Sequence, residues 1–328
     1  MSAVAEDPVS SLRALVTRRW QAIDPLLPDP APPSAGCGTE LVVPGPDGHP
    51  AVIGTCEHWQ GEAGSLDLSW GAARRFMLSP QIAGPDIGDA LDRLLSLWRQ
   101  HLAGVPGSAD PDTAAVVTWP SRDIDGVRTL LRHGLAPLGV VAARPMGPRP
   151  GRAGNSQAGP GLAGDAEAPL PGLRIRRAGT EDLAAVARLG LEVIRYDAHF
   201  GGVIERPGTL DALRGELPPM LAGEAWTWLA ERDGTPIGLL AAERPEAAGW
   251  IAPMVRLSPV AYLMLMVVAP EERGTGTGAL MVSRLHDEVT AAGVPVTLLH
   301  YEQTNPLTGG IHRRVPAGLA SQEVQSGR

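Results

Sequence analysis

The stretch VVAPEERGTGTGALM, Val267 to Met281, indicates how the second half of this chain folds. The apolar run Tyr262 to Val268 predicts a strand that is buried on both faces. After Gly278, apolar residues recur at helical spacing until Gly293, which predicts a helix. The glycines therefore lie between a strand end and a helix N-terminus, where unpaired N–H groups and the helix dipole suit a phosphate or pyrophosphate. Arg273 adds a fixed positive charge at the mouth of this loop.

The residues of this loop follow a recognisable order, Val268-Ala269-Pro270 and then Arg273-Gly274-Thr275-Gly276-Thr277-Gly278. This order resembles the acetyl-CoA loop of the GCN5-related N-acetyltransferase superfamily, whose preceding strand hydrogen-bonds the pantetheine arm. The resemblance implies acetyl-CoA as the acyl donor and no metal. It implies that acetyl-CoA is contacted by Met266, Val267, Val268, Arg273, Gly274, Thr275, Gly276, Thr277, Gly278, Ala279 and Asn305.

A dinucleotide-binding fingerprint is the competing interpretation of the same glycines. Gly274, Gly276 and Ala279 satisfy G-x-G-x-x-A, and Glu302 lies at about the distance expected of a ribose-binding acid. A dinucleotide loop follows its strand directly, whereas Pro270 to Arg273 intervene here. The order of residues therefore favours the acetyltransferase loop.

Composition limits the class of protein. The chain has 328 residues, 44% of them hydrophobic, which allows two domains with real cores. A net charge of −8 argues against a nucleic-acid partner, and the absence of lysine excludes P-loop, Schiff-base and pyridoxal-phosphate lysines. The two cysteines, Cys37 and Cys56, form no metal motif. The N-terminal residues lack a signal-peptide core and no apolar run is long enough to span a bilayer, so we expect a cytoplasmic protein without membrane contact.

A segment rich in proline, glycine and alanine divides the chain. Residues 145–172 predict a flexible linker between domains at 1–144 and 173–328. In the second domain, Leu173 to Arg177 and Val296 to Tyr301 predict strands, and Asp233-Gly234 predicts a hairpin. The resemblance implies an α/β (α+β) class with two acyl-CoA N-acyltransferase-like domains, each a mixed, mostly antiparallel sheet flanked by helices.

The first half resembles the same fold in a degenerate copy. Its equivalent of the phosphate loop has Ala83 in place of arginine, Pro85 in place of a donor N–H, and Asp86 in place of a glycine. The segment AAVVTWPSRDIDGVRTLLRHGLAPLGVVAAR predicts a strand, a helix and a closing hairpin of this half. An unrelated α/β domain is the alternative.

Two residues are candidates for proton transfer. Glu243, at the end of the strand before the central one, is the candidate base, and a solvated carboxylate is the alternative. The family often has a tyrosine seven positions after the asparagine that Asn305 matches, as the acid for the thiol. Here that position is His312, which is either the proton donor or a surface residue.

The segment after Asn305 is short, polar and rich in glycine and proline, so it hardly fits a closing hairpin. We therefore expect the second sheet to be incomplete. The first functional hypothesis is an acyl-CoA-dependent N-acetyltransferase that acts on an unidentified small-molecule or protein amine. The alternative is a catalytically inactive CoA-binding sensor or scaffold. The sequence does not indicate an oligomeric state.

Overall fold

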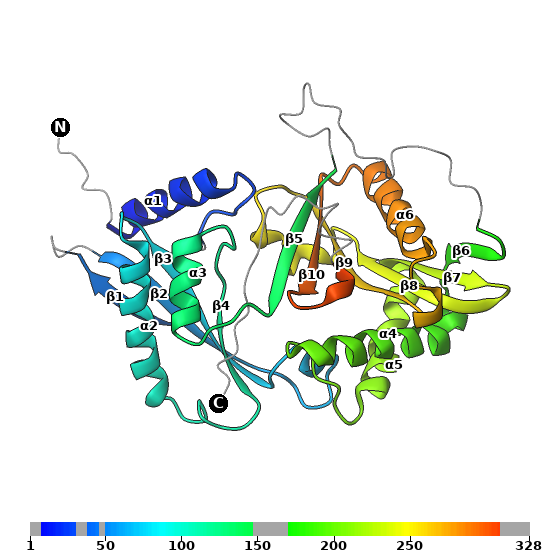
Figure 1. Ribbon diagram of the computed structural model, residues 1–328, viewed down its shortest axis with the longest axis horizontal. Helices are drawn as coiled ribbons and strands as arrows, with labels where there is room; N and C mark the ends of the chain where they lie inside the picture. The colour runs from blue at the N-terminus through cyan, green and yellow to red at the C-terminus, as the bar shows by residue number, and fades with distance from the viewer. Residues whose placement is uncertain (1–7, 31–37, 46–49, 147–169, 309–328) are drawn as a thin grey trace, which may run out of the picture.

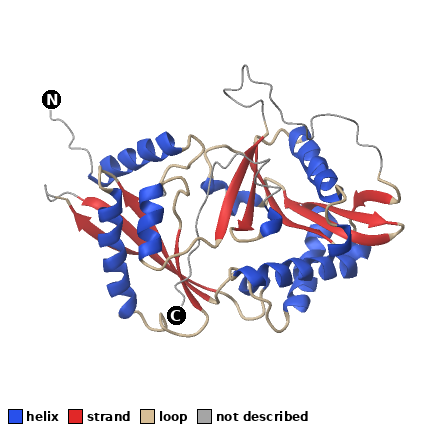
Figure 2. Ribbon diagram, viewed as in Figure 1, coloured by secondary structure: helices blue, strands red, loops and turns tan. Residues whose placement is uncertain are grey.

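A computed structural model describes residues 8–30, 38–45, 50–146 and 170–308. Within these ranges the strands form two mixed sheets, with the orders β1-β2-β3-β4 and β5-β10-β9-β8-β7-β6. Helices pack against both sheets, which lie at opposite ends of an elongated molecule (Figure 1; Figure 2). The predicted fold class, two mixed and mostly antiparallel sheets flanked by helices, is confirmed.

The first sheet is antiparallel except for its last pair, β3 and β4, which is parallel. Its elements are α1 (Pro8–Ile23), β1 (Thr39–Pro44), β2 (Pro50–Gln60), β3 (Arg74–Ile82), α2 (Ile87–Ala103), β4 (Thr113–Val117) and α3 (Ile124–Arg132). Helix α2 follows β3 as the helix of the phosphate loop would. The loop between them is Ala83 to Asp86, the segment that the sequence indicated to be degenerate.

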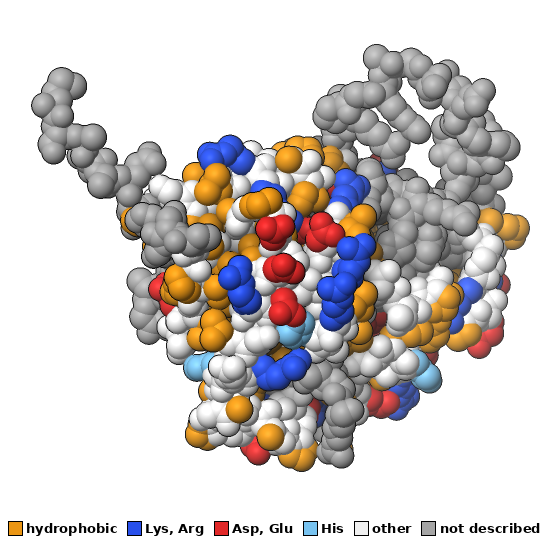
Figure 3. All heavy atoms as spheres, turned by 60° about the vertical axis from the view of Figure 1, so that its left-hand side comes forward, with side chains coloured by type: hydrophobic (Ala, Val, Ile, Leu, Met, Phe, Trp, Pro, Cys, Tyr) orange, Lys and Arg blue, Asp and Glu red, His pale blue; other side chains and the backbone are white. Residues whose placement is uncertain are grey.

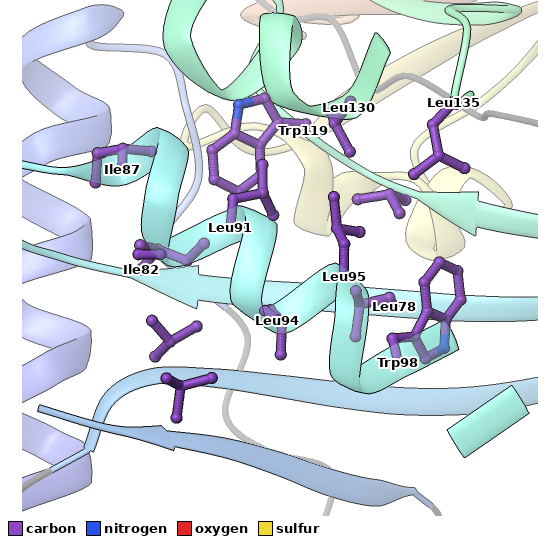
Figure 4. Packing of buried hydrophobic residues seen from close by; sticks show 14 of the residues in the cluster. Leu78, Ile82, Ile87, Leu91, Leu94, Leu95, Trp98, Trp119, Leu130 and Leu135 are labelled. Atoms are coloured by element: carbon purple, nitrogen blue, oxygen red, sulfur yellow. The ribbon is translucent and has the colours of Figure 1, made fainter. Parts of the chain in front are cut away.

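Beyond the end of β4, the space between β3 and the helices is filled by Trp119. Its side chain is 1% exposed and packs with Leu91 and Leu130 in the core of the first half (Figure 4). A Cβ on Gly126 would lie 2.1 Å from the indole nitrogen of Trp119, so α3 closes tightly over the ring. Trp119 and α3 therefore fill the region beyond the end of the β3–β4 pairing.

The second sheet is antiparallel except for one pair, β9 and β10, which is parallel. The hairpin predicted at Asp233-Gly234 is confirmed, because both residues have left-handed φ values, 49° and 80°, between β7 and β8. The elements are β6 (Leu173–Arg177), α4 (Leu183–Asp197), α5 (Thr209–Pro219), β7 (Ala225–Arg232), β8 (Thr235–Glu243), β9 (Val260–Val268), α6 (Thr277–Ala291) and β10 (Val296–Glu302).

Strand β5 (Gly139–Pro145) belongs to the second sheet although it precedes the linker. It pairs antiparallel with β10 along its whole length, from Gly139↔Glu302 to Pro145↔Val296. The prediction that this segment closes the first half as a hairpin is wrong. The same ladder supplies an outer strand to the second sheet, which the sequence after Asn305 led us to expect to be incomplete. The boundary predicted at residue 144 stays a prediction, and the β5–β10 ladder runs across it.

A second set of contacts joins the halves beside α5. The Arg206 guanidinium donates to both carboxylate oxygens of Asp112, at 2.7 and 2.9 Å, and to the Gly71 carbonyl at 3.1 Å. The hydrogen bonds from Arg206 are the main reason that the pKa of Asp112 is lowered. Leu66 and Trp70 of the first half pack into the core under α4 and α5. The two halves therefore share both a sheet and a core.

On the face shown in Figure 3, acidic side chains gather in a row, and basic side chains lie on both sides of this row. Among the helices that the structure describes, none combines the length and the apolar character that a bilayer crossing needs.

We predict that the second half needs β5 to be stable. A fragment of residues 170–328 lacks β5 and exposes the edge of β10, whereas a fragment of residues 136–328 retains the ladder. Val141 of this ladder is fully buried, and burial of one such side chain contributes about 1.5–3 kcal/mol to the free energy of unfolding. The shorter fragment should therefore unfold at least about 5 °C lower, or aggregate, in calorimetry and circular dichroism. Equal unfolding temperatures would show that β5 is dispensable.

Candidate functional site

The candidate site begins where β9 and β10 separate. The parallel pairing ends at Leu263↔Leu299, while β9 continues to Val268 and β10 to Glu302. The β8–β9 register shifts at the same place, because Ala242 pairs with Leu263 but Ala241 pairs with Leu265, which leaves Met264 as a bulged residue. A bulge bends its strand and increases the local twist. The two strands therefore diverge and leave the backbone of residues 264–268 without a β10 partner.

A cavity of about 590 Å³ occupies this divergence. The structure brings together around it all but one of the residues predicted to contact acetyl-CoA. These are Met266, Val267, Val268, Arg273, Gly274, Gly276, Thr277, Gly278, Ala279 and Asn305. The exception is Thr275, whose hydroxyl donates to the Glu272 carbonyl at 2.8 Å and so braces the loop from within.

The glycine loop has the backbone conformation that the sequence predicted. Gly274 and Gly276 have φ values of 80° and 94°, in the left-handed region that favours glycine. Gly278 lets the first turn of α6 approach β9, because a Cβ there would lie 2.9 Å from the Met266 methyl group. Within the described residues no side chain caps the start of α6. The N–H groups of its first turn are thus available to an anion in the cavity.

Arg273 spans the mouth of the cavity. Its Nε donates to the Val268 carbonyl at 3.1 Å, and its guanidinium carbon lies 5.0 Å from the centre of the Tyr196 ring. The arginine therefore connects the end of β9 to α4. Behind it, Arg232 and Glu272 form two hydrogen bonds of 2.8 Å that fix the acidic turn before the glycines.

Asp197 is a cavity residue that the sequence analysis missed. It is the last residue of α4, and its Oδ1 accepts a hydrogen bond of 3.0 Å from Asn305 Nδ2. Burial raises the pKa of Asp197 to about 6, an effect that the Asn305 hydrogen bond only partly offsets. Nothing in the local sequence, a helix ending in Tyr-Asp-Ala-His-Phe, distinguishes this carboxylate from a solvated one.

Glu243, the predicted base, lies beside the cavity and does not line it. Its Oε2 accepts a hydrogen bond of 2.9 Å from the indole nitrogen of Trp250, and burial raises its pKa. The neighbouring His300 does line the cavity. His300 is open to solvent, but the protein around its ring lowers its pKa to about 4 by desolvation, so the ring is neutral at pH 7.

The first half also contributes to the cavity wall. Arg144 of β5 lines it together with His286 of α6, and the charge of Arg144 adds to burial in lowering the pKa of His286 to about 4. The linker separates Arg144 from every other cavity residue in the sequence, so no local pattern could have identified it.

His312, the predicted acid, lies outside the described residues. In the part of the chain that the structure describes, no group of three or more His, Cys, Asp or Glu residues is placed to hold a metal ion. Cys56 is buried and its pKa is raised to about 11 by desolvation, and Cys37 lies outside the described residues.

No family model and no curated protein matches this chain. Solved structures that are similar to it include a GCN5-related N-acetyltransferase from Sphaerobacter thermophilus, with 15% identity, 86% of this chain and 78% of that chain covered, and a TM-score of 0.48. Another, from Kribbella flavida, has 13% identity, 97% and 96% covered, and a TM-score of 0.43. The PaiA N-acetyltransferase from Thermoplasma acidophilum, in complex with coenzyme A, has 13% identity, 47% and 98% covered, and a TM-score of 0.35. The first two neighbours bear the family name that the glycine loop suggested, and likenesses at this identity and TM-score assign neither a substrate nor an activity to this chain.

If the loop holds a pyrophosphate, Gly276→Asp should abolish acetyl-CoA binding, because it places a carboxylate at the start of α6. Titration calorimetry on the folded variant measures this. Gly208→Asp is a matched control, because Gly208 also precedes a helix with a left-handed φ of 89° and lies outside the cavity wall. Binding by Gly276→Asp within about threefold of the unsubstituted protein, or about 0.7 kcal/mol, would contradict the assignment.

The raised pKa of Asp197 predicts a pH-dependent stability. The folded protein binds this proton more tightly than the unfolded chain, so burial of the charged form lowers stability. This cost is absent below about pH 4 and complete above about pH 6. Asp197→Asn removes the charge and keeps an acceptor for Asn305. Its stability relative to the unsubstituted protein should rise by about 1–2 kcal/mol between pH 4 and pH 7.5 in denaturant titrations. A difference that does not change with pH would refute this.

Proposed function

We propose that this protein is an acetyl-CoA-dependent N-acetyltransferase whose acyl donor binds in the cavity between β9 and β10. The proposal rests on one observation: two features that suit different parts of acetyl-CoA lie at the same cavity. One is a glycine loop at the uncapped start of α6, which suits a pyrophosphate. The other is the stretch of β9, residues 264–268, that lacks a β10 partner and suits an extended amide-bearing arm.

The shape of the cavity suits both ends of such a donor. Val267 and Val268 lie between the glycine loop and the point where the strands separate, so a molecule anchored at the loop can extend along β9. The bulge at Met264 interrupts the β8–β9 ladder close to that point. A backbone N–H near a bulge is a suitable donor to the oxyanion that forms when a thioester is attacked.

The proposed reaction is direct acyl transfer. The lone pair of a neutral amine attacks the thioester carbon, a C–N bond forms, and the C–S bond breaks as sulfur leaves with the bonding pair. The nitrogen loses its proton to a base, and the thiolate takes a proton from a donor or from solvent. Glu243 is the proposed base, because burial raises its pKa and because it accepts a hydrogen bond from Trp250, which stacks on the cavity residue His300. His312 is kept as the proposed acid.

Asp197 is the second carboxylate with a pKa suited to a base, and it lines the cavity directly. Its hydrogen bond with Asn305 couples it to the residue that the resemblance places near the cofactor. The two carboxylates can be separated by experiment, because Glu243 and Asp197 lie on different elements, β8 and α4.

We predict that Glu243→Gln lowers kcat by about 10²–10⁴-fold and leaves the Kd of acetyl-CoA nearly unchanged, because a base acts in the chemical step. The assay measures free CoA released from acetyl-CoA with a panel of amines. Glu246→Gln, a change at an exposed carboxylate three residues away, is the matched control and should be silent. If Asp197→Asn causes the loss and Glu243→Gln does not, Asp197 is the base. Tight acetyl-CoA binding without turnover on any amine would favour the inactive sensor or scaffold.

A further inference from the structure

An aromatic cluster lies at the point where β9 and β10 separate, on the sheet face opposite α6. The last paired residues, Leu263 and Leu299, pack in the core that contains α6 side chains. Successive strand residues point to opposite faces, so Tyr262 and His300 lie on the other face. The Tyr262 hydroxyl is 3.1 Å from Nδ1 of His300, within hydrogen-bond distance.

Trp250 completes the cluster and joins it to a carboxylate. Its ring is stacked on His300, with centroids 6.1 Å apart and planes 5° apart, and it meets Tyr262 edge-on at 5.0 Å. Its indole nitrogen donates to Oε2 of Glu243. Trp250 is 57% exposed, which is unusual for a tryptophan that has three specific partners. The cluster is therefore ordered by its own contacts and open to solvent.

The cluster also adjoins the cavity. His300 lines the cavity and stacks on Trp250, so the cluster borders the cavity through this one residue. On the same face, the cavity is also lined by Val193, Tyr196 and Asp197 of α4. A second reactant that enters on this face would therefore meet the aromatic cluster on one side and α4 on the other.

We propose that Glu243, Trp250, Tyr262 and His300 form the acceptor subsite, and that this subsite selects a cationic amine with an apolar or aromatic body. Electron-rich aromatic faces attract cations, and a half-buried carboxylate provides the opposite charge. His300 is neutral at pH 7 and so does not repel an ammonium group. The chain carries a net charge of −8, which also attracts cationic acceptors.

The subsite is consistent with the proposed acetyl transfer. Its role as an acceptor site rests on that proposed function. Because the indole nitrogen of Trp250 donates a hydrogen bond to Oε2 of Glu243, an ammonium group would bind at Oε1. Transfer of one proton from the ammonium nitrogen to this carboxylate gives the neutral amine that attacks the thioester, and the nitrogen loses its second proton, after the attack, to the departing thiolate. The same contact thus binds the charged form and produces the reactive one.

The test uses the full chain and a probe that cannot be acetylated, phenethyltrimethylammonium. Its control is the uncharged carbon analogue (3,3-dimethylbutyl)benzene, and binding is followed by saturation-transfer NMR and titration calorimetry. The cation should bind at least about tenfold more tightly than its analogue. Trp250→Ala should weaken cation binding by about 3- to 30-fold, the range expected for a cation–aromatic contact. The cation affinity of Trp250→Phe should lie between those of the parent chain and Trp250→Ala. This second variant keeps the test decisive if the alanine variant is poorly folded.

Trp59→Ala is the matched control, because Trp59 stacks on Arg75 in the first half, 4.3 Å from its guanidinium carbon, and lies outside the cavity wall. It should leave cation binding unchanged, and every variant should keep the acetyl-CoA affinity of the parent chain. Equal binding of the cation and its carbon analogue, or full cation binding by both Trp250 variants, overturns the subsite. Binding of the probe needs no turnover, so it can be interpreted independently of acetyl-CoA. A failure of acetyl-CoA binding would refute the acetyltransferase proposal without changing the result for the cation site.

Discussion

The divergence of two parallel strands is the constraint on which the candidate site depends. Parallel strands normally remain paired, because each missing hydrogen bond between them leaves a backbone N–H or C=O group without a partner. Here the pairing of β9 and β10 stops at Leu263↔Leu299, and the bulge at Met264 bends β9 at the same point. The fold itself therefore leaves the backbone of residues 264–268 of β9 without a β10 partner, beside the cavity. In the first half, Trp119 fills the space beyond the end of β4, so this half is packed where the second half has a cavity.

The ladder between β5 and β10 makes this divergence possible. Strand β10 leaves β9 after Leu299, but it remains hydrogen-bonded to β5 as far as Glu302. Without β5, the diverging arm of β10 would be an isolated edge with unpaired N–H and C=O groups on both sides. The first half thus stabilises the arm of the site that the second half cannot hold alone. Arg206 and Asp112 add a separate ionic contact between the halves near α5.

Charge is distributed unequally across the sheet at this site. The positive end of α6 and Arg273 lie at the glycine loop, which suits the phosphates of a donor. The carboxylates with raised pKa values, Asp197 and Glu243, belong to α4 and β8. An anionic donor and a cationic acceptor would therefore meet complementary fields from different elements.

Much of this arrangement is readable from the sequence, because it depends on local chemistry. The glycines at 274 and 276 are needed for left-handed backbone, and the alternation of apolar residues with turn signals predicts the strands and the hairpin at Asp233-Gly234. These features concern residues that are neighbours in the chain. The tertiary structure alone decided that β5 joins the other sheet, that Arg144 and Asp197 reach the cavity, and that Trp250 stacks on His300 beside Glu243. Each of these depends on contacts between residues far apart in the chain, and the side chains involved have no local pattern that sets them apart from ordinary surface or core residues.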